Sequence, residues 1–137
     1  MRVVLDTNVL LVSLPKISPY CIIFENLIPG DFELLVTGEI IHEYKEVIGR
    51  KTTKGIAENI SELLAQLDNV KLVNVFYQWN LIDKDPDDNK FVDCAISGNA
   101  SFIVTNDRHF EVLKEVPFPK MDVLRIDEYL ERQKKLK

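Results

Sequence analysis

The chain has 137 residues, of which 46% are hydrophobic and 28% are charged, and its formal net charge is −5 at pH 7. This size and composition fit a soluble globular protein with one domain over residues 1–137. The negative balance argues against broad binding of nucleic acid through a basic surface. It does not exclude a nuclease whose acidic residues are neutralised by metal ions.

No run of about 18 apolar residues occurs in the sequence, so we expect no membrane-spanning segment. Asp6 and Asn8 interrupt the apolar stretch near the N-terminus, which argues against a signal peptide. Cys21 and Cys94 lie far apart and form no C-x-x-C motif. We therefore expect reduced thiols and a cytoplasmic location, the alternative being a single structural disulfide.

The first third of the chain alternates between strands and helices. Its strands are short, continuous apolar runs, and its helices begin at residues that favour N-caps or the first helical turn. The predicted elements are a strand over residues 2–5, a helix from Ser18-Pro19 through Leu27, a turn at residues 29–31, a strand over 32–36 and a helix capped by Thr37.

The alternation continues to the end of the chain. The further predicted elements are a basic loop over 49–55, a helix from Ile56 through Leu67, a strand over 70–76, a polar and acidic segment over 80–89, a helix to about Ser97, a strand over 102–104, a short helix over 107–113, a strand over 121–126 and a charged helix from Asp127. This order predicts an α/β domain with a parallel sheet covered by helices on both faces.

Two aspartates follow predicted strands in the same manner. Asp6 ends the first strand, and Asp107 comes shortly after the strand over 102–104. Ligands bind open parallel sheets at the carboxyl ends of their strands, so both carboxylates are expected at one edge. For either residue alone, an N-cap is the competing interpretation.

Glu43 borders the apolar face of the helix after the second strand. The apolar residues of that helix run from Ile40 to Ile48 on one face, whereas His42 points nearly opposite to it. Glu43 is therefore the acid of this helix that can lean over the sheet edge. A boundary glutamate with its carboxylate in water is the alternative.

Asp88 lies at the centre of an apolar helical face, three and four residues before Phe91 and Val92. Asp87 and Asp93 fall off this face, and Asp85 or Asp87 can provide the N-cap. A merely solvated acid has no reason to occupy the middle of a buried stripe. Asp88 therefore carries the clearest signal of a functional carboxylate.

Four acids are thus expected to meet, namely Asp6, Glu43, Asp88 and Asp107. Two carboxylates about 4 Å apart repel each other by roughly 1–4 kcal/mol, so the cluster requires bound cations or raised pKa values. Oxygen ligands without cysteine and without a well-placed histidine favour Mg²⁺ or Mn²⁺ over Zn²⁺. Such ions activate water for the hydrolysis of phosphoryl groups.

The sequence resembles the PIN-domain ribonucleases, and within them the VapC-like toxins of toxin–antitoxin pairs. Four segments carry the resemblance in the right order: V-V-L-D-T-N-V-L, T-G-E-I-I-H-E-Y-K-E-V-I, D-P-D-D-N-K-F-V-D-C-A-I and F-I-V-T-N-D-R-H-F. Together they cover nearly the whole chain.

This resemblance implies a Rossmann-like α/β/α domain and an endoribonuclease that depends on Mg²⁺ or Mn²⁺. It implies that Asp6, Glu43, Asp88 and Asp107 are the catalytic metal ligands. It also implies an RNA substrate, an antitoxin partner and a homodimer.

Further residues are expected around these acids. Thr7, Asn8, Thr105 and Asn106 are candidates to orient ligands or water. Without its four site acids the chain has 22 − 4 = 18 acids against 17 bases, a balance of −1. RNA contacts are then local, and the candidates are Arg50, Lys51, Lys54, Lys90 and Arg108. His109 is expected to be structural, the alternative being a general base, and Asp93 is a further acid considered for the site.

Two other functions compete with the nuclease. A haloacid-dehalogenase-like phosphatase also has an aspartate after its first strand, but it expects a second one where this chain has Asn8. A non-catalytic PIN-like interaction module is the other alternative, and an incomplete set of acids would favour it.

Overall fold

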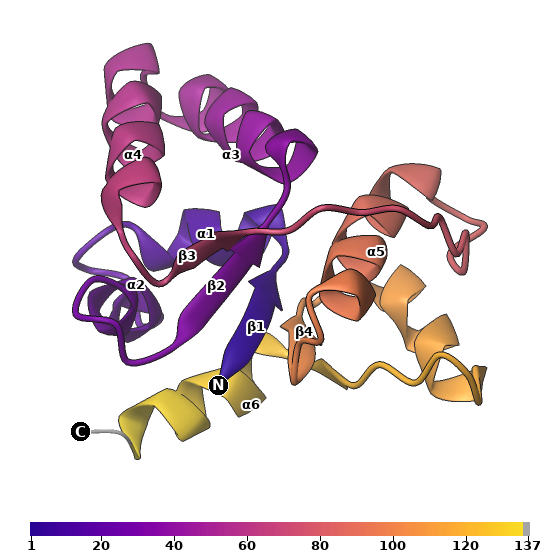
Figure 1. The fold of residues 1–137 in the computed structure, drawn as a ribbon. Helices are drawn as coiled ribbons and strands as arrows, with labels where there is room; N and C mark the ends of the chain where they lie inside the picture. Colours follow the sequence, from indigo (N-terminus) through magenta and orange to yellow (C-terminus); the bar gives the residue numbers. More distant parts are fainter. Residues whose placement is uncertain (136–137) are drawn as a thin grey trace.

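The computed structural model describes residues 1–135 and shows one five-stranded sheet in which every strand pair is parallel (Figure 1). The strands are β1 (Arg2–Leu5), β2 (Glu33–Val36), β3 (Val70–Leu72), β4 (Phe102–Val104) and β5 (Val123–Leu124). Their spatial order is β3-β2-β1-β4-β5. From β1 the chain adds β2 and β3 on one side of the sheet, and then β4 and β5 on the other side. This parallel sheet with its helices confirms the predicted α/β class.

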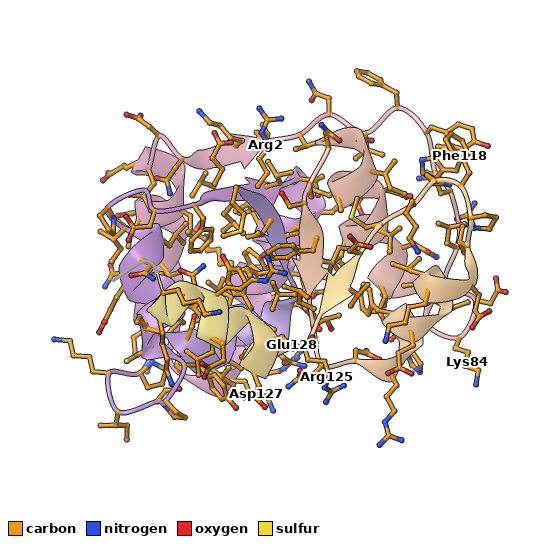
Figure 2. All side chains as sticks on the ribbon, turned by 90° about the horizontal axis from the view of Figure 1, so that it is seen from below. Arg2, Lys84, Phe118, Arg125, Asp127 and Glu128 are labelled. Carbon is orange, nitrogen blue, oxygen red and sulfur yellow. The ribbon has the colours of Figure 1, made fainter. Side chains whose placement is uncertain are left out.

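Helices cover both faces of the sheet. They are α1 (Thr7–Ser13), α2 (Cys21–Leu27), α3 (Gly38–Lys51), α4 (Lys54–Gln66), α5 (Asn89–Ser97) and α6 (Ile126–Lys134), with 3₁₀ helices η1 (Pro86–Asp88) and η2 (Arg108–Glu115). Helix α5 packs on β1, β2 and β4. Helix α2 packs on both α1 and α6, and Figure 2 shows α6 across the sheet from α5. Among the described residues no helix is long and apolar enough to span a membrane.

The core is continuous through the central strands. Val3, Val4 and Leu5 of β1 have no exposed surface, and all three residues of β4 are buried. Both strands are therefore apolar on both sides, as expected for parallel strands between helical layers. A rigid central pair of strands positions the polar residues that follow it.

Several predicted elements differ from the observed ones. The predicted loop over 49–55 is wrong, because α3 continues to Lys51 and α4 begins at Lys54, capped by the Thr53 hydroxyl. Gly49 lies where the two helices meet, and a β-carbon there would make an ordinary contact, 3.5 Å from the β-carbon of Ala57. The strands predicted over 70–76 and 121–126 shrink to three and two residues. Helix α1 was not predicted.

Candidate functional site

The carboxyl ends of β1 and β4 lie side by side, and a threonine connects the acids that follow them. Leu5 pairs with Val104, so Asp6 and Thr105 leave the sheet together. Thr105 is 1% exposed, and its hydroxyl donates to Asp6 Oδ2 at 2.7 Å. The same hydroxyl oxygen accepts the Asp107 main-chain N–H at 3.0 Å. The predicted position of both acids at one sheet edge is therefore what the structure shows.

Glu43 reaches this edge because α3 is fixed to the end of β1. The buried Tyr44 donates its hydroxyl hydrogen to the Leu5 carbonyl at 2.5 Å. The neighbouring Glu43 carboxylate accepts a hydrogen bond from the Thr7 hydroxyl and pairs with Lys90 Nζ at 2.6 Å. Glu43 thus reaches the site with its charge already balanced by an ammonium group.

Asp88 ends η1 directly before α5 and is 9% exposed. The next residue, Asn89, fixes this junction, because its amide group exchanges two hydrogen bonds of 2.9 Å with the main chain of Ile82. This clamp holds the preceding segment against α5. It also places Asp85, which caps η1 by accepting the Asp87 main-chain N–H at 3.2 Å, beside Asp88.

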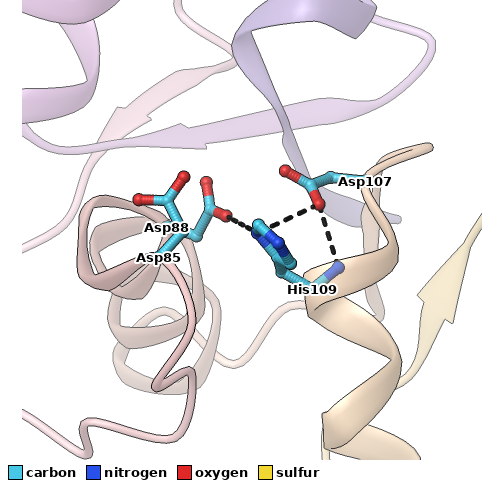
Figure 3. Close-up of side chains that lie close together, drawn as sticks. All are labelled: Asp85, Asp88, Asp107 and His109. Carbon is cyan, nitrogen blue, oxygen red and sulfur yellow. Dashed lines mark hydrogen bonds and ion pairs between the residues drawn. The ribbon is translucent and has the colours of Figure 1, made fainter.

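Figure 3 shows the tightest group of polar side chains in the site, formed by Asp85, Asp88, Asp107 and His109. One ligand atom from each of the four lies within 4.8 Å of the others. His109 Nδ1 is 3.5 Å from Asp88 Oδ2 and 3.4 Å from Asp107 Oδ1. We call these four side chains the Asp–His cluster. Asp6 and Glu43 lie beside it rather than in it.

The electrostatics of the site oppose ionisation of its buried acids. Burial, together with the negative charges of Asp107, Asp85 and Asp6, raises the pKa of Asp88 from 3.8 to about 7, and the neighbouring His109 opposes part of this rise. Burial also raises the pKa of Asp6, although the hydrogen bond from Thr105 counteracts part of this effect. A site that penalises negative charge in this manner favours any bound cation.

The chemistry of these residues fits a divalent metal ion. Within residues 1–135, Asp88 Oδ2 and His109 Nδ1 are both buried and neither makes a hydrogen bond. Buried polar atoms are rarely left without a partner, and a metal ion satisfies both a carboxylate oxygen and an imidazole nitrogen. Asp88 and Asp107 are the predicted ligands closest to such an ion.

The predicted polar neighbours of the acids have different surroundings. Asn8 is exposed and lines a hollow together with Asp6 and Asp107. Thr7 and Thr105 bind the carboxylates of Glu43 and Asp6. Asn106 instead accepts the Ile126 main-chain N–H at 3.0 Å, so its side-chain oxygen holds the start of α6.

The predicted RNA-binding bases lie in three places. Lys90 is paired with Glu43 inside the site, and Arg108 is exposed directly after Asp107. The other three, Arg50, Lys51 and Lys54, surround the junction of α3 and α4. Arg50 lies about 10 Å along α3 from Glu43, at 1.5 Å for each residue, so this group is not in the site itself.

Two features were not foreseen. Asp93 was expected off the buried face of α5, yet it is 6% exposed and its Oδ1 accepts the Trp79 main-chain N–H at 3.0 Å. Asp85 was expected only as a cap, and His109 as a structural residue or a general base, but both belong to the Asp–His cluster. The spacing D-x-H after the fourth strand was a signal for His109, since it places the ring only two positions after Asp107.

Comparisons with known proteins agree with this architecture. The family model described as PIN domain matches residues 2–109. No curated protein matches the chain. A solved structure titled VapBC2 from Rickettsia felis, bound to a DNA fragment from their promoter, contains a chain of similar fold. The TM-score is 0.61 at 19% sequence identity, and the match covers 91% of this chain and 98% of that chain.

Proposed function

The chain belongs to the PIN-domain family, and on that premise we propose that it is a metal-dependent endoribonuclease that acts as the toxin of a toxin–antitoxin pair. The observation that carries the proposal is the buried Asp88 carboxylate oxygen, which makes no hydrogen bond and lies 3.5 Å from His109 Nδ1 at the carboxyl edge of the sheet. Proteins of this family are nucleases, and this edge is where ligands bind in open parallel sheets.

We infer that Asp6, Asp88 and Asp107 hold Mg²⁺ or Mn²⁺, with Glu43 completing the acidic set. A divalent ion held there would supply an activated water and neutralise charge on the scissile phosphate. Thr105 fixes the orientation of the Asp6 carboxylate through its hydrogen bond. Lys90 limits the negative charge around Glu43, so the four carboxylates can lie together in the folded protein.

Two hollows flank the acids and support an extended substrate. One is lined by Asp6, Asn8 and Asp107, and the other by Glu43, Lys90 and Asp87. A nucleic-acid backbone that occupies both hollows would have one of its phosphates next to the acids that lie between them. The exposed Arg108 lies beside Asp107, where it can contact a neighbouring phosphate.

The proposed partners rest on the VapC-like segments of the sequence and on the solved complex titled VapBC2. We propose an antitoxin protein as the partner of this chain and a homodimer as its own assembly. We also propose that the protein acts in the cytoplasm, where it would encounter both RNA and a protein antitoxin.

The test is cleavage of a mixed RNA pool with Mn²⁺, with Mg²⁺ and with EDTA. We expect cleavage that requires metal and is lost in Asp88→Asn. The matched control is Asp68→Asn, which removes the same charge from an exposed residue between α4 and β3 and should cleave like the wild type. Equal cleavage by both variants would refute the assignment of the site. No cleavage together with no metal binding would favour the non-catalytic interaction module.

A further inference from the structure

His109 directs a ring nitrogen into the group of carboxylates rather than into solvent (Figure 3). The chain has two histidines, and the other one, His42, has a side chain that is 80% exposed. In contrast, Nδ1 of His109 is buried between Asp88 and Asp107 and makes no hydrogen bond within the described residues. The two histidines therefore have very different surroundings.

The backbone fixes this direction of the ring. The His109 main-chain N–H donates to Asp107 Oδ1 at 2.9 Å, which caps the start of η2. The next residue, Phe110, has no exposed surface and anchors the first turn of η2 in the core. The ring of His109 is thus held on the side of η2 that faces Asp88.

Asp85 approaches the same point from the other side. Its carboxylate is held by the cap of η1, and the clamp between Asn89 and Ile82 prevents this segment from moving away from α5. Asp85 is separate from the acids that the family resemblance implied. Its presence gives the Asp–His cluster three carboxylates and one imidazole.

We propose that Asp85, Asp88, Asp107 and His109 together form one coordination site that selects Mn²⁺ or a similar transition-metal ion over Mg²⁺. This inference rests on the proposed function, because it assigns ligands and selectivity to the metal of that site. Mg²⁺ prefers oxygen ligands and retains its water, whereas imidazole suits transition metals. One nitrogen among three carboxylates therefore shifts the preference toward Mn²⁺.

The distances fit such a site. Ligand atoms about 2.1 Å from an ion lie about 3.0 Å apart along an octahedral edge and about 3.4 Å apart along a tetrahedral edge. The observed separations from Nδ1 to the two carboxylates are 3.5 and 3.4 Å. The ligand atom of Asp85 lies within 4.8 Å of the other three, so its side chain has to move closer for all four atoms to reach one ion.

An ion pair offers the competing explanation of the same geometry. A protonated His109 would balance the charges of Asp88 and Asp107 without binding any metal. The two explanations predict opposite effects of removing the ring. Loss of a ligand weakens binding of Mn²⁺, whereas loss of a competing positive charge strengthens it.

The experiment measures Mn²⁺ and Mg²⁺ affinity by calorimetry, at one fixed pH, for wild type, His109→Gln and the control His42→Gln. We expect His109→Gln to weaken Mn²⁺ binding by at least about tenfold. Mg²⁺ binding should change much less, and His42→Gln should match the wild type. Asp85→Asn keeps the cap of η1 and should weaken the binding of both ions.

Pulsed electron paramagnetic resonance gives a readout that does not depend on affinity or activity. Mn²⁺ in the wild type should couple to a nitrogen nucleus, and this coupling should vanish in His109→Gln but persist in His42→Gln. Unchanged or stronger Mn²⁺ binding by His109→Gln, without nitrogen coupling in the wild type, would overturn this inference alone. A wild type that binds neither ion would overturn the proposed function as well.

Discussion

Asp88→Asn should stabilise the metal-free protein at high pH, although it removes a residue of the proposed site. The pKa of Asp88 is about 7 in the folded protein, against 3.8 for an ordinary aspartate, chiefly because the side chain is buried. The folded state therefore holds this proton more tightly than the unfolded chain does. The protonated Asp88 carboxyl therefore gives its full contribution to stability below about pH 4, and this contribution is lost as the pH rises through about 7.

The magnitude follows from the two pKa values. A difference of about 3 corresponds to about 4 kcal/mol, which is an upper limit because the side chain retains some contact with water. The difference between the free energies of unfolding of Asp88→Asn and of the wild type should be about 1–3 kcal/mol more in favour of the variant at pH 8 than at pH 5. The acids facing Asp88 are present in both proteins, so the difference in the free energy of unfolding reports on the Asp88 carboxyl alone.

Urea unfolding in EDTA at pH 5, 6, 7 and 8 measures the effect. The control is Asp87→Asn, which changes the same charge at an exposed position and should follow the wild type at every pH. Parallel curves for Asp88→Asn and wild type would refute the idea that burial penalises the Asp88 carboxylate. Added Mn²⁺ should reverse the order, because the ion stabilises the wild type and has lost a ligand in the variant.

Three further outcomes are expected. Thr105→Val should lower the free energy of unfolding by about 1–3 kcal/mol in urea titrations, since it leaves a buried N–H group and carboxylate without their shared hydroxyl. Lys90→Gln should tighten Mn²⁺ binding in calorimetry, because it removes the positive charge 2.6 Å from Glu43; weaker binding would contradict this. Gly98→Ala should cost about 1–3 kcal/mol in thermal or urea unfolding, because the new β-carbon would lie 2.6 Å from a leucine side chain. Gly38→Ala, with open space around it, is its control.

The predictions that succeeded depended on local pattern. The apolar runs of β1, β2 and β4 and the N-cap at Thr37 are visible within a few residues, and the structure confirms them. The strand-end position of Asp6 and Asp107 follows from a general property of parallel sheets, so it could also be foreseen. Boundaries were less predictable, because Gly49 favours a loop in isolation but lies within α3 here, where this helix packs on α4.

The parts of the site that were missed depend on contacts between distant segments. Asp85 and Asp88 share the turn of η1, and they become part of the Asp–His cluster because this turn faces His109, 21 positions after Asp88 (109 − 88). Lys90 was expected to face RNA, but its partner Glu43 lies on another helix, 47 positions earlier (90 − 43). No periodicity within one helix predicts such a pairing.

The order of the strands also governs when the site can exist during synthesis. Asp6 precedes its hydrogen-bond partner Thr105 by 99 positions, so it leaves the ribosome well before that partner. Until β4 has emerged and paired with β1, a nascent chain carries Asp6, Glu43 and Asp88 without the edge that brings them together. Contacts this distant in sequence also slow folding. A translating ribosome therefore carries only an unassembled form of this site until β4 and the residues that follow it have emerged.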